Sequence, residues 1–167
     1  MLTREQLTAD QWEAVRDTPH HVIVAVSVAG GSAFDEMLER AAGLRGIVEA
    51  RDSAHPLLSE IAGAQHIMHA QNGIRRWYYT LQEPERTPRN LQDKALETAR
   101  NALDALGTHG TADDLLHYGQ FVLSLADRVA RAAREGDVLG IGGQLVSDEE
   151  RRFIERLDQL IQDRRGS

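Results

Sequence analysis

The sequence contains no cysteine and, among its 167 residues, only one lysine, Lys94. Without cysteine the chain can form no disulfide, no thiolate nucleophile and no sulfur-ligated zinc or iron–sulfur centre. Without a lysine behind a glycine-rich loop it also lacks the GxxxxGK[ST] signature that cradles nucleotide phosphates. These two absences remove thiol chemistry and P-loop nucleotide binding from the functions to be considered.

The chain also lacks a long apolar run and an excess of positive charge. Its longest apolar stretch, residues 22–31, is too short to cross a bilayer, and the charged N-terminal segment does not resemble a signal peptide. The net charge of −7 disfavours a general nucleic-acid-binding surface. We therefore expect a cytoplasmic protein with no membrane span and no nucleic-acid partner. Arginine exceeds lysine 18 to 1, which we interpret as the coding bias of a GC-rich bacterial genome.

What the chain does contain is a series of helix-start signals separated by apolar residues at helical spacing. Helix ends are expected at Gly107 and Gly136, and Asn72-Gly73 is expected to end or kink a further helix. The predicted helix starts are Thr8, Thr18-Pro19, Ser32, Pro56, Thr87-Pro88, Thr111 and Ser147. One of the stripes expected to face the core consists of Phe34, Met37, Leu38, Ala41, Leu44 and Val48.

Residues 20–31, HHVIVAVSVAGG, are rich in β-branched side chains and resemble a strand. No second strand-like run exists to pair with them, and an unpaired strand would leave its backbone unsatisfied. We therefore expect a buried apolar helix here, with His20 and His21 exposed in its first turn. The sequence predicts an all-α fold, a single domain over 1–167, built as a bundle of six or seven helices around this central helix. Residues 163–167 are expected to fray.

The glycine-rich stretch GDVLGIGGQLVSDEER spans residues 136–151. A calcium loop beginning at Asp137 would need oxygen ligands where Leu139 and Ile141 stand. We interpret the stretch as a connector between two helices, in which glycines permit tight turns and Ser147 caps the following helix.

A related pattern occurs at residues 29–36 (AGGSAFDE) and 141–150 (IGGQLVSDEE), where paired glycines precede a serine and an acidic first turn. This resembles the helix-entry pattern of TerB-like domains, an all-helical bacterial family linked to tellurite resistance and stress response. The resemblance implies an all-helical fold and a stress-linked role. Gly30 and Gly142 stand where the family pattern has aspartate. The family's acidic positions, which are associated with metal binding, correspond here to Glu36, Asp148, Glu149 and Glu150.

The seven histidines raise the alternative of a metal- or small-ligand-binding bundle. Metal sites in helical bundles need ligands that project into the bundle. The spacing instead predicts that His66 and His117 lie far from the apolar stripes of their helices. We expect no cofactor, with a divalent metal as the alternative. The candidate ligands for that alternative are His66, His69, Asp113, His117, Glu36 and Glu150.

The segment NGIRRWYYTLQ, residues 72–82, combines arginines with consecutive aromatic residues in a chain that is only 5% aromatic. The spacing of Trp77, Tyr78 and Leu81 fits a core stripe. Arginine, tyrosine and tryptophan are also favoured anchors of protein interfaces. The interface candidates are Arg75, Arg76, Trp77 and Tyr79. No local catalytic signature such as GxSxG is present, although a dispersed active site would leave none. We therefore expect a non-enzymatic accessory or interaction protein that binds a protein partner or associates with itself.

Overall fold

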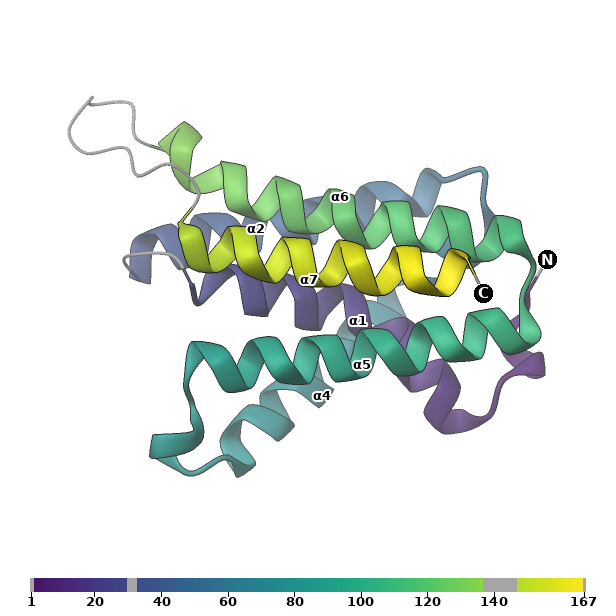
Figure 1. The fold of residues 1–167 in the computed structure, drawn as a ribbon, viewed down its shortest axis with the longest axis horizontal. Coiled ribbons are helices and arrows are strands. Elements are labelled where there is room, and N and C mark those ends of the chain that lie inside the picture. The colour runs from purple at the N-terminus through teal and green to yellow at the C-terminus, as the bar shows by residue number, and fades with distance from the viewer. Residues whose placement is uncertain (1, 30–32, 137–146, 167) are drawn as a thin grey trace.

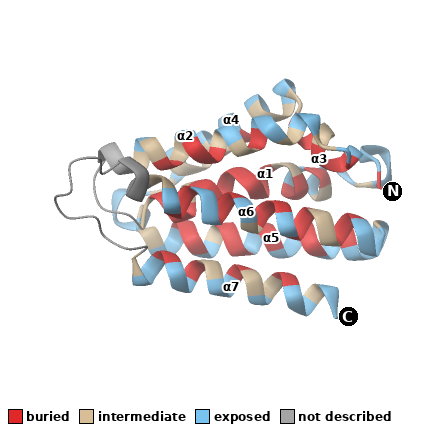
Figure 2. Ribbon diagram, turned by 90° about the horizontal axis from the view of Figure 1, so that it is seen from above, coloured by how far each residue is buried: buried red, intermediate tan, exposed pale blue. Residues whose placement is uncertain are grey.

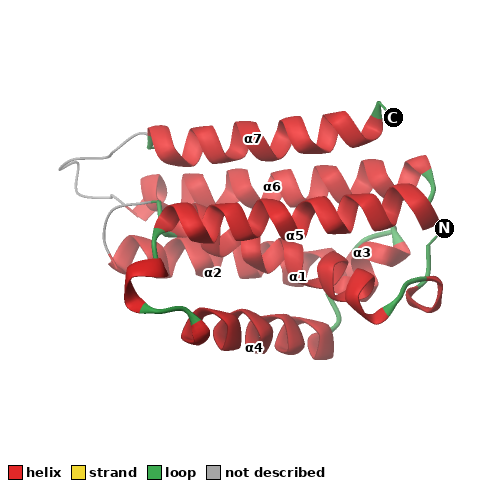
Figure 3. Ribbon diagram, turned by 60° about the horizontal axis from the view of Figure 1, so that its bottom comes forward, coloured by secondary structure: helices red, strands yellow, loops and turns green. Residues whose placement is uncertain are grey.

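The computed structural model describes residues 2–29, 33–136 and 147–166. Within these ranges the chain forms seven α-helices and three short 3₁₀ helices, and no strand (Figure 3). The α-helices are α1 (Ala9–Ser27), α2 (Ala33–Glu49), α3 (Pro56–Ile61), α4 (Ala64–Thr80), α5 (Pro88–His109), α6 (Ala112–Gly136) and α7 (Asp148–Arg165). The expected all-α bundle of six or seven helices is confirmed. None of the described helices is long and apolar enough to cross a membrane.

The helix α1 lies at the centre of the bundle, as the apolar segment predicted. It packs against α2, α4, α5, α6 and α7 (Figure 1), and most of its length is buried (Figure 2). The helices α4 and α7 lie on opposite sides of this centre (Figure 3). The residues of α1, α5 and α6 that form the middle of the core include Val15, Val22, Val26, Leu103, Leu106, Val122 and Val129. Their burial supplies the main favourable contribution to folding.

The predicted helix start at Thr18-Pro19 is wrong, because α1 begins at Ala9 and runs through Pro19 without a break. Proline has no N–H, so it cannot donate to the carbonyl four residues earlier, that of Val15. The hydroxyl of Tyr118 in α6 donates to this carbonyl instead, over 2.8 Å. The Thr18 hydroxyl also donates a hydrogen bond to a main-chain carbonyl of the same helix, that of Ala14. A contact between distant parts of the chain thus stabilises a helix interior that local sequence rules read as a boundary.

The expectation that His20 and His21 are exposed is also wrong, since they lie in the middle of α1 with 3% and 8% of their surface exposed. Burial, and then the charge of Arg16, lower the pKa of His20 to about 4. Burial, followed by the charges of Lys94 and His20, lowers the pKa of His21 to about 3. Both imidazoles are therefore neutral at physiological pH.

Three further helix boundaries differ from the prediction. Asn72-Gly73 lies inside α4, and the chain breaks earlier, between α3 and α4 at Ala62-Gly63. Gly107 lies within the last turns of α5, which ends at His109. The C-terminal helix α7 continues to Arg165, through most of the segment expected to fray. A single glycine interior to a helix costs about 1 kcal/mol relative to alanine, which tertiary packing can offset, so its presence alone does not fix a boundary.

The helix α2 buries a different face from the predicted stripe, since Met37 and Val48 are 57% and 47% exposed. Its inner face includes Gly43, Gly46 and the fully buried Ile47. A Cβ atom on Gly43 would lie 2.6 Å from a side-chain carbon of α1, and one on Gly46 would lie 2.6 Å from a side-chain carbon of α6. Small residues therefore let α2 approach its neighbours closely, which a search for large apolar residues does not detect.

The predicted caps that fall on described residues otherwise hold. Thr8 and Thr87 accept hydrogen bonds from the first turns of α1 and α5. At α7, the Ser147 hydroxyl accepts from the Glu150 N–H over 3.1 Å, and the Glu150 carboxylate accepts from the Ser147 N–H over 2.6 Å. The predicted glycine connector and the rejected calcium loop at Asp137 fall on residues 137–146, outside the described ranges.

Candidate functional sites

A groove of about 650 Å³ lies between α4 and the helices α1, α2 and α5. We call it the α4 groove. It arises because α4 packs mainly on α1, with further contacts to α3. Its apolar lining consists of Ile23, Val24, Val28, Leu44, Ile74 and Leu91. Figure 3 shows α4 set apart from the remaining long helices.

Two faces of α4 have different surroundings. Gln71, Ile74, Arg75 and Tyr78 follow helical spacing and line the α4 groove. Trp77 lies on another face, where its ring is 5.8 Å from the ring of His21 in α1. The helix is therefore held to the bundle by one face, while the adjacent face borders the groove.

Three guanidinium groups and one carboxylate give the α4 groove a positive balance of charge. Arg40 is held by hydrogen bonds to the Ser27 hydroxyl at 3.0 Å and to the Glu36 carboxylate at 3.1 Å. Arg75 is exposed and has no ion pair with another described residue. His20 also lines the groove and adds no charge, because its pKa is about 4. In a chain with a net charge of −7, this groove favours an anionic ligand.

The third guanidinium, that of Arg86, is positioned by aromatic rings. Its central carbon lies 5.0 Å from the ring centre of Tyr78 and 5.8 Å from that of Tyr79. Such stacking is favourable for arginine. Arg86, Tyr78 and Tyr79 thus contact one another in the lining of the groove, where Tyr79 is 68% exposed.

The four interface candidates are thus separated by the structure. Arg75 and Tyr79 line the α4 groove. Arg76 is exposed and is not part of the groove lining, and Trp77 is half-buried against α1.

A second cluster brings His55 together with Asp113 and His117, which both belong to α6. One ligand atom from each lies within 4.8 Å of the other two. The His55 Nε2 atom is 3.6 Å from Asp113 Oδ2, and the His117 Nδ1 atom is 3.3 Å from Asp113 Oδ1. The two imidazole rings stack with their centres 4.8 Å apart. We call this group the His–Asp cluster.

The helix starts position the His–Asp cluster. His55 is the N-cap residue of α3 and is 9% exposed, whereas Asp113 belongs to the first turn of α6. The neighbouring Asp114, 1% exposed, completes the predicted capping box, accepting from the Thr111 N–H at 2.9 Å and the Thr111 hydroxyl at 2.8 Å. Burial raises the pKa of Asp114, but hydrogen bonds from Thr111 and Leu2 outweigh this effect and lower it. Its other oxygen lies 3.4 Å from His55 Nε2.

The other predicted metal ligands do not join this cluster. His66 packs edge-on against Trp12, with ring centres 5.2 Å apart, and His69 is exposed. Glu36 pairs with Arg40, and Glu150 belongs to the cap of α7. Sequence reasoning missed His55, because no local pattern links it to residues more than fifty positions away.

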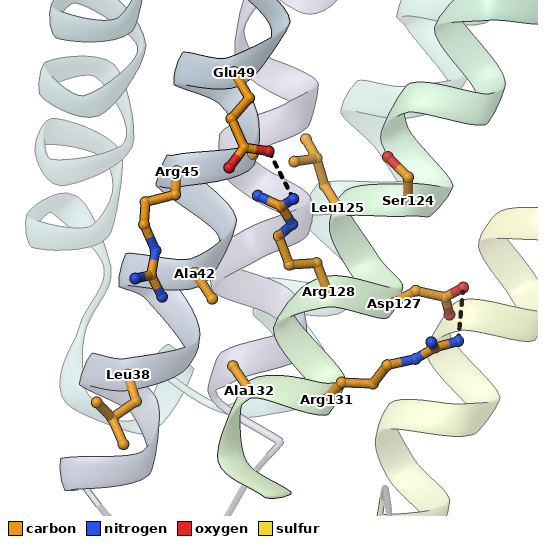
Figure 4. Close-up of a pocket in the computed structure, with 11 residues that line it drawn as sticks. Leu38, Ala42, Arg45, Glu49, Ser124, Leu125, Asp127, Arg128, Arg131 and Ala132 are labelled. Carbon is orange, nitrogen blue, oxygen red and sulfur yellow. Dashed lines mark hydrogen bonds and ion pairs between the residues drawn. The ribbon is translucent and has the colours of Figure 1, made fainter. Parts of the chain in front are cut away.

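A larger groove, of about 940 Å³, runs between α2 and α6 (Figure 4). Four of its charged side chains pair with one another, Arg128 with Glu49 at 2.7 Å and Arg131 with Asp127 at 3.8 Å. Only Arg45 lines the groove without an ion pair to a described residue, so this groove offers less to an anionic ligand than the α4 groove does.

No known protein family, curated protein or solved structure matches the chain. The α4 groove and the His–Asp cluster are therefore the basis on which function is inferred.

Proposed function

We propose that the chain is a non-enzymatic interaction protein that binds an acidic, amphipathic helical segment of a partner protein in the α4 groove. The observation that carries this proposal is the combination of an apolar lining with Arg40, Arg75 and Arg86 in one groove. An amphipathic helix commonly docks by placing its apolar face in such a groove. Acidic residues flanking that face would meet the three guanidinium groups.

The tyrosines support a protein ligand. Tyr79 is the most exposed of the large hydrophobic residues that the structure describes, at 68%, and it lies beside Arg86 at the groove. Arginine and tyrosine are enriched among the residues that contribute most to binding at protein interfaces. Covering Tyr79 and the apolar lining with a partner helix would remove apolar surface from water.

A bacterial origin, a cytoplasmic location and a stress-linked role of the TerB-like kind belong to the same proposal. They rest on the composition of the chain and on the glycine–serine–acid pattern at 29–36 and 141–150. An accessory protein without chemistry of its own would serve such a role by binding another component.

The test uses adjacent arginines as a matched pair. A display library of helical peptides is selected against the purified protein, and the affinities of the enriched peptides are measured by fluorescence anisotropy. Arg75→Glu places a negative charge in the groove, whereas Arg76→Glu makes the same change on an exposed residue outside its lining. We expect acidic amphipathic peptides to be enriched, and to lose at least about tenfold in affinity with Arg75→Glu but little with Arg76→Glu.

Equal losses in the two variants would indicate nonspecific charge attraction and contradict the proposal. Enrichment of peptides without acidic residues would contradict it too. Light scattering on the wild type and on Arg75→Glu adds a separate check, because self-association that Arg75→Glu abolishes would identify a second copy of this acidic chain as the partner.

A further inference from the structure

The His–Asp cluster has the donor set of a metal centre and shares no residue with the α4 groove. It combines two imidazoles and a carboxylate, contributed by the start of α3 and the first turns of α6. The function proposed above makes no use of it. The cluster is also more than a pair of neighbours on one helix, because His55 comes from a separate part of the chain.

The spacing of the donor atoms fits a small divalent ion. Ligand atoms about 2.0–2.1 Å from a tetrahedral ion lie roughly 3.3 Å from one another. The distances here are 3.3 Å between His117 Nδ1 and Asp113 Oδ1, and 3.6 Å between His55 Nε2 and the other oxygen of Asp113, Oδ2. One ligand atom from each of the three residues lies within 4.8 Å of the other two, so the exposed side chains would have to rotate to bring all three donors to one ion.

One member of the cluster, His55, is buried, whereas Asp113 and His117 are exposed enough to change their rotamers. The His55 side chain is 8% exposed, whereas those of Asp113 and His117 are 69% and 43% exposed. His117 can therefore turn out of its stacked position and exchange its 3.0 Å hydrogen bond to the Asp113 carbonyl for coordination. An ion would reach the cluster from the solvent side, with His55 beneath it.

The buried ring of His55 supplies an independent reason to expect a ligand. Its Nε2 atom faces Asp113 and Asp114 at 3.6 and 3.4 Å, longer than good hydrogen bonds. A buried nitrogen with such weak interactions is costly, and coordination of an ion by Nε2 would provide a strong interaction.

We propose that His55, Asp113 and His117 bind one divalent transition-metal ion, with zinc as the representative of its class. Imidazole and carboxylate donors without thiolate suit zinc and its first-row neighbours. Three protein ligands leave a coordination position for water or for a group from another molecule. The ion would join the start of α3 to the start of α6.

The experiment is a calorimetric titration of the full chain with ZnCl₂, after removal of any histidine tag and treatment with a chelator that is then dialysed away. We expect one ion per chain. Removing a ligand should lower the affinity at least as much as removing an outer-shell partner of a metal site does, about tenfold or more. The variants are His117→Ala and Asp113→Asn, because both side chains are exposed and their loss should not unfold the protein.

His69→Ala is the matched control, since His69 is exposed on α4 and lies outside the cluster. It should bind zinc as the wild type does. Circular dichroism verifies that all variants keep their helices. The proposal is overturned if the wild type takes up no stoichiometric zinc or if His117→Ala binds it with unchanged affinity. It is likewise overturned if His69→Ala abolishes binding, because the ion would then occupy the surface pair His66 and His69.

Discussion

The hydroxyl of Tyr118 donates a 2.8 Å hydrogen bond to the main-chain carbonyl of Val15, 103 residues earlier in the chain. This is the carbonyl that Pro19 leaves without its helical donor. Val15 is fully buried and Tyr118 is 1% exposed, so water cannot replace the phenol. The contact allows α1 to pass through a proline at the centre of the bundle, and it joins α1 to α6.

Replacement of Tyr118 by phenylalanine should therefore destabilise the protein by about 1–3 kcal/mol, the cost of leaving a buried carbonyl unsatisfied. In a Pro19→Ala background the alanine N–H can donate to the same carbonyl. Tyr118→Phe should then cost less, by about 1 kcal/mol. Urea unfolding of the four proteins in this double-mutant cycle measures the coupling.

The control for this cycle is Tyr79→Phe, which alters an exposed tyrosine and should change the stability by less than about 0.5 kcal/mol. If Tyr118→Phe costs the same with and without Pro19, the phenol does not act as the substitute for the missing helix donor.

The contact between Tyr118 and Val15 shows which parts of the fold can be predicted from the sequence. Capping residues act over three positions, so Thr8, Thr87 and Ser147 identify their helix starts correctly. Pro19 is misread because its compensation comes from α6, and the signal at Thr18 is indistinguishable locally from a real start. The inner face of α2 is misread because close packing there selects Gly43 and Gly46 over large apolar residues.

The residues of the candidate sites likewise include some that a short stretch of sequence identifies and others that only the packing of distant segments brings in. Arg75 and Tyr79 stand out in the sequence because they belong to one short aromatic and basic segment. Asp113 and His117 share one helix and are found by their spacing, whereas His55 joins them only through the packing of α3 beside α6. Arg40 and Arg86 reach the α4 groove from two other parts of the chain, so no local pattern identifies the groove.

Two helical glycines give opposite predictions for substitution by alanine. A Cβ atom on Gly119 would lie 2.6 Å from a side-chain carbon of Ile161 in α7, whereas one on Gly107 would meet nothing within 4 Å. Gly119→Ala should destabilise the protein by about 1–3 kcal/mol through overpacking. Gly107→Ala should stabilise it by about 0.5–1 kcal/mol, because alanine loses less backbone entropy in a helix.

Thermal or urea unfolding of the two variants and the wild type decides this prediction, and each variant serves as the control for the other. The close approach of α6 to α7 would be incorrect if alanine at position 119 were as well tolerated as alanine at position 107.

The buried histidines of α1 predict how stability responds to pH. In the unfolded chain His20 and His21 bind protons below about pH 6.5, but their folded pKa values are about 4 and 3. Between these limits the unfolded state binds more protons, so stability must fall as the pH decreases. From pH 7 to pH 5 each histidine should account for a loss of about 2 kcal/mol. Urea unfolding at several pH values in this window measures the slope.

The variant His20→Gln/His21→Gln should flatten this pH dependence whatever its stability at pH 7, because glutamine does not titrate. His69→Gln, which alters an exposed histidine outside α1, should change the slope much less, only through the effect of its charge on the pKa of His66. A slope that survives the double substitution would have to come from other groups. His66 is one of these, because burial, followed by the charges of Arg16, Arg4 and His69, also lowers its pKa. Persistence of the full slope would therefore contradict the assignment of the acid sensitivity to the centre of α1.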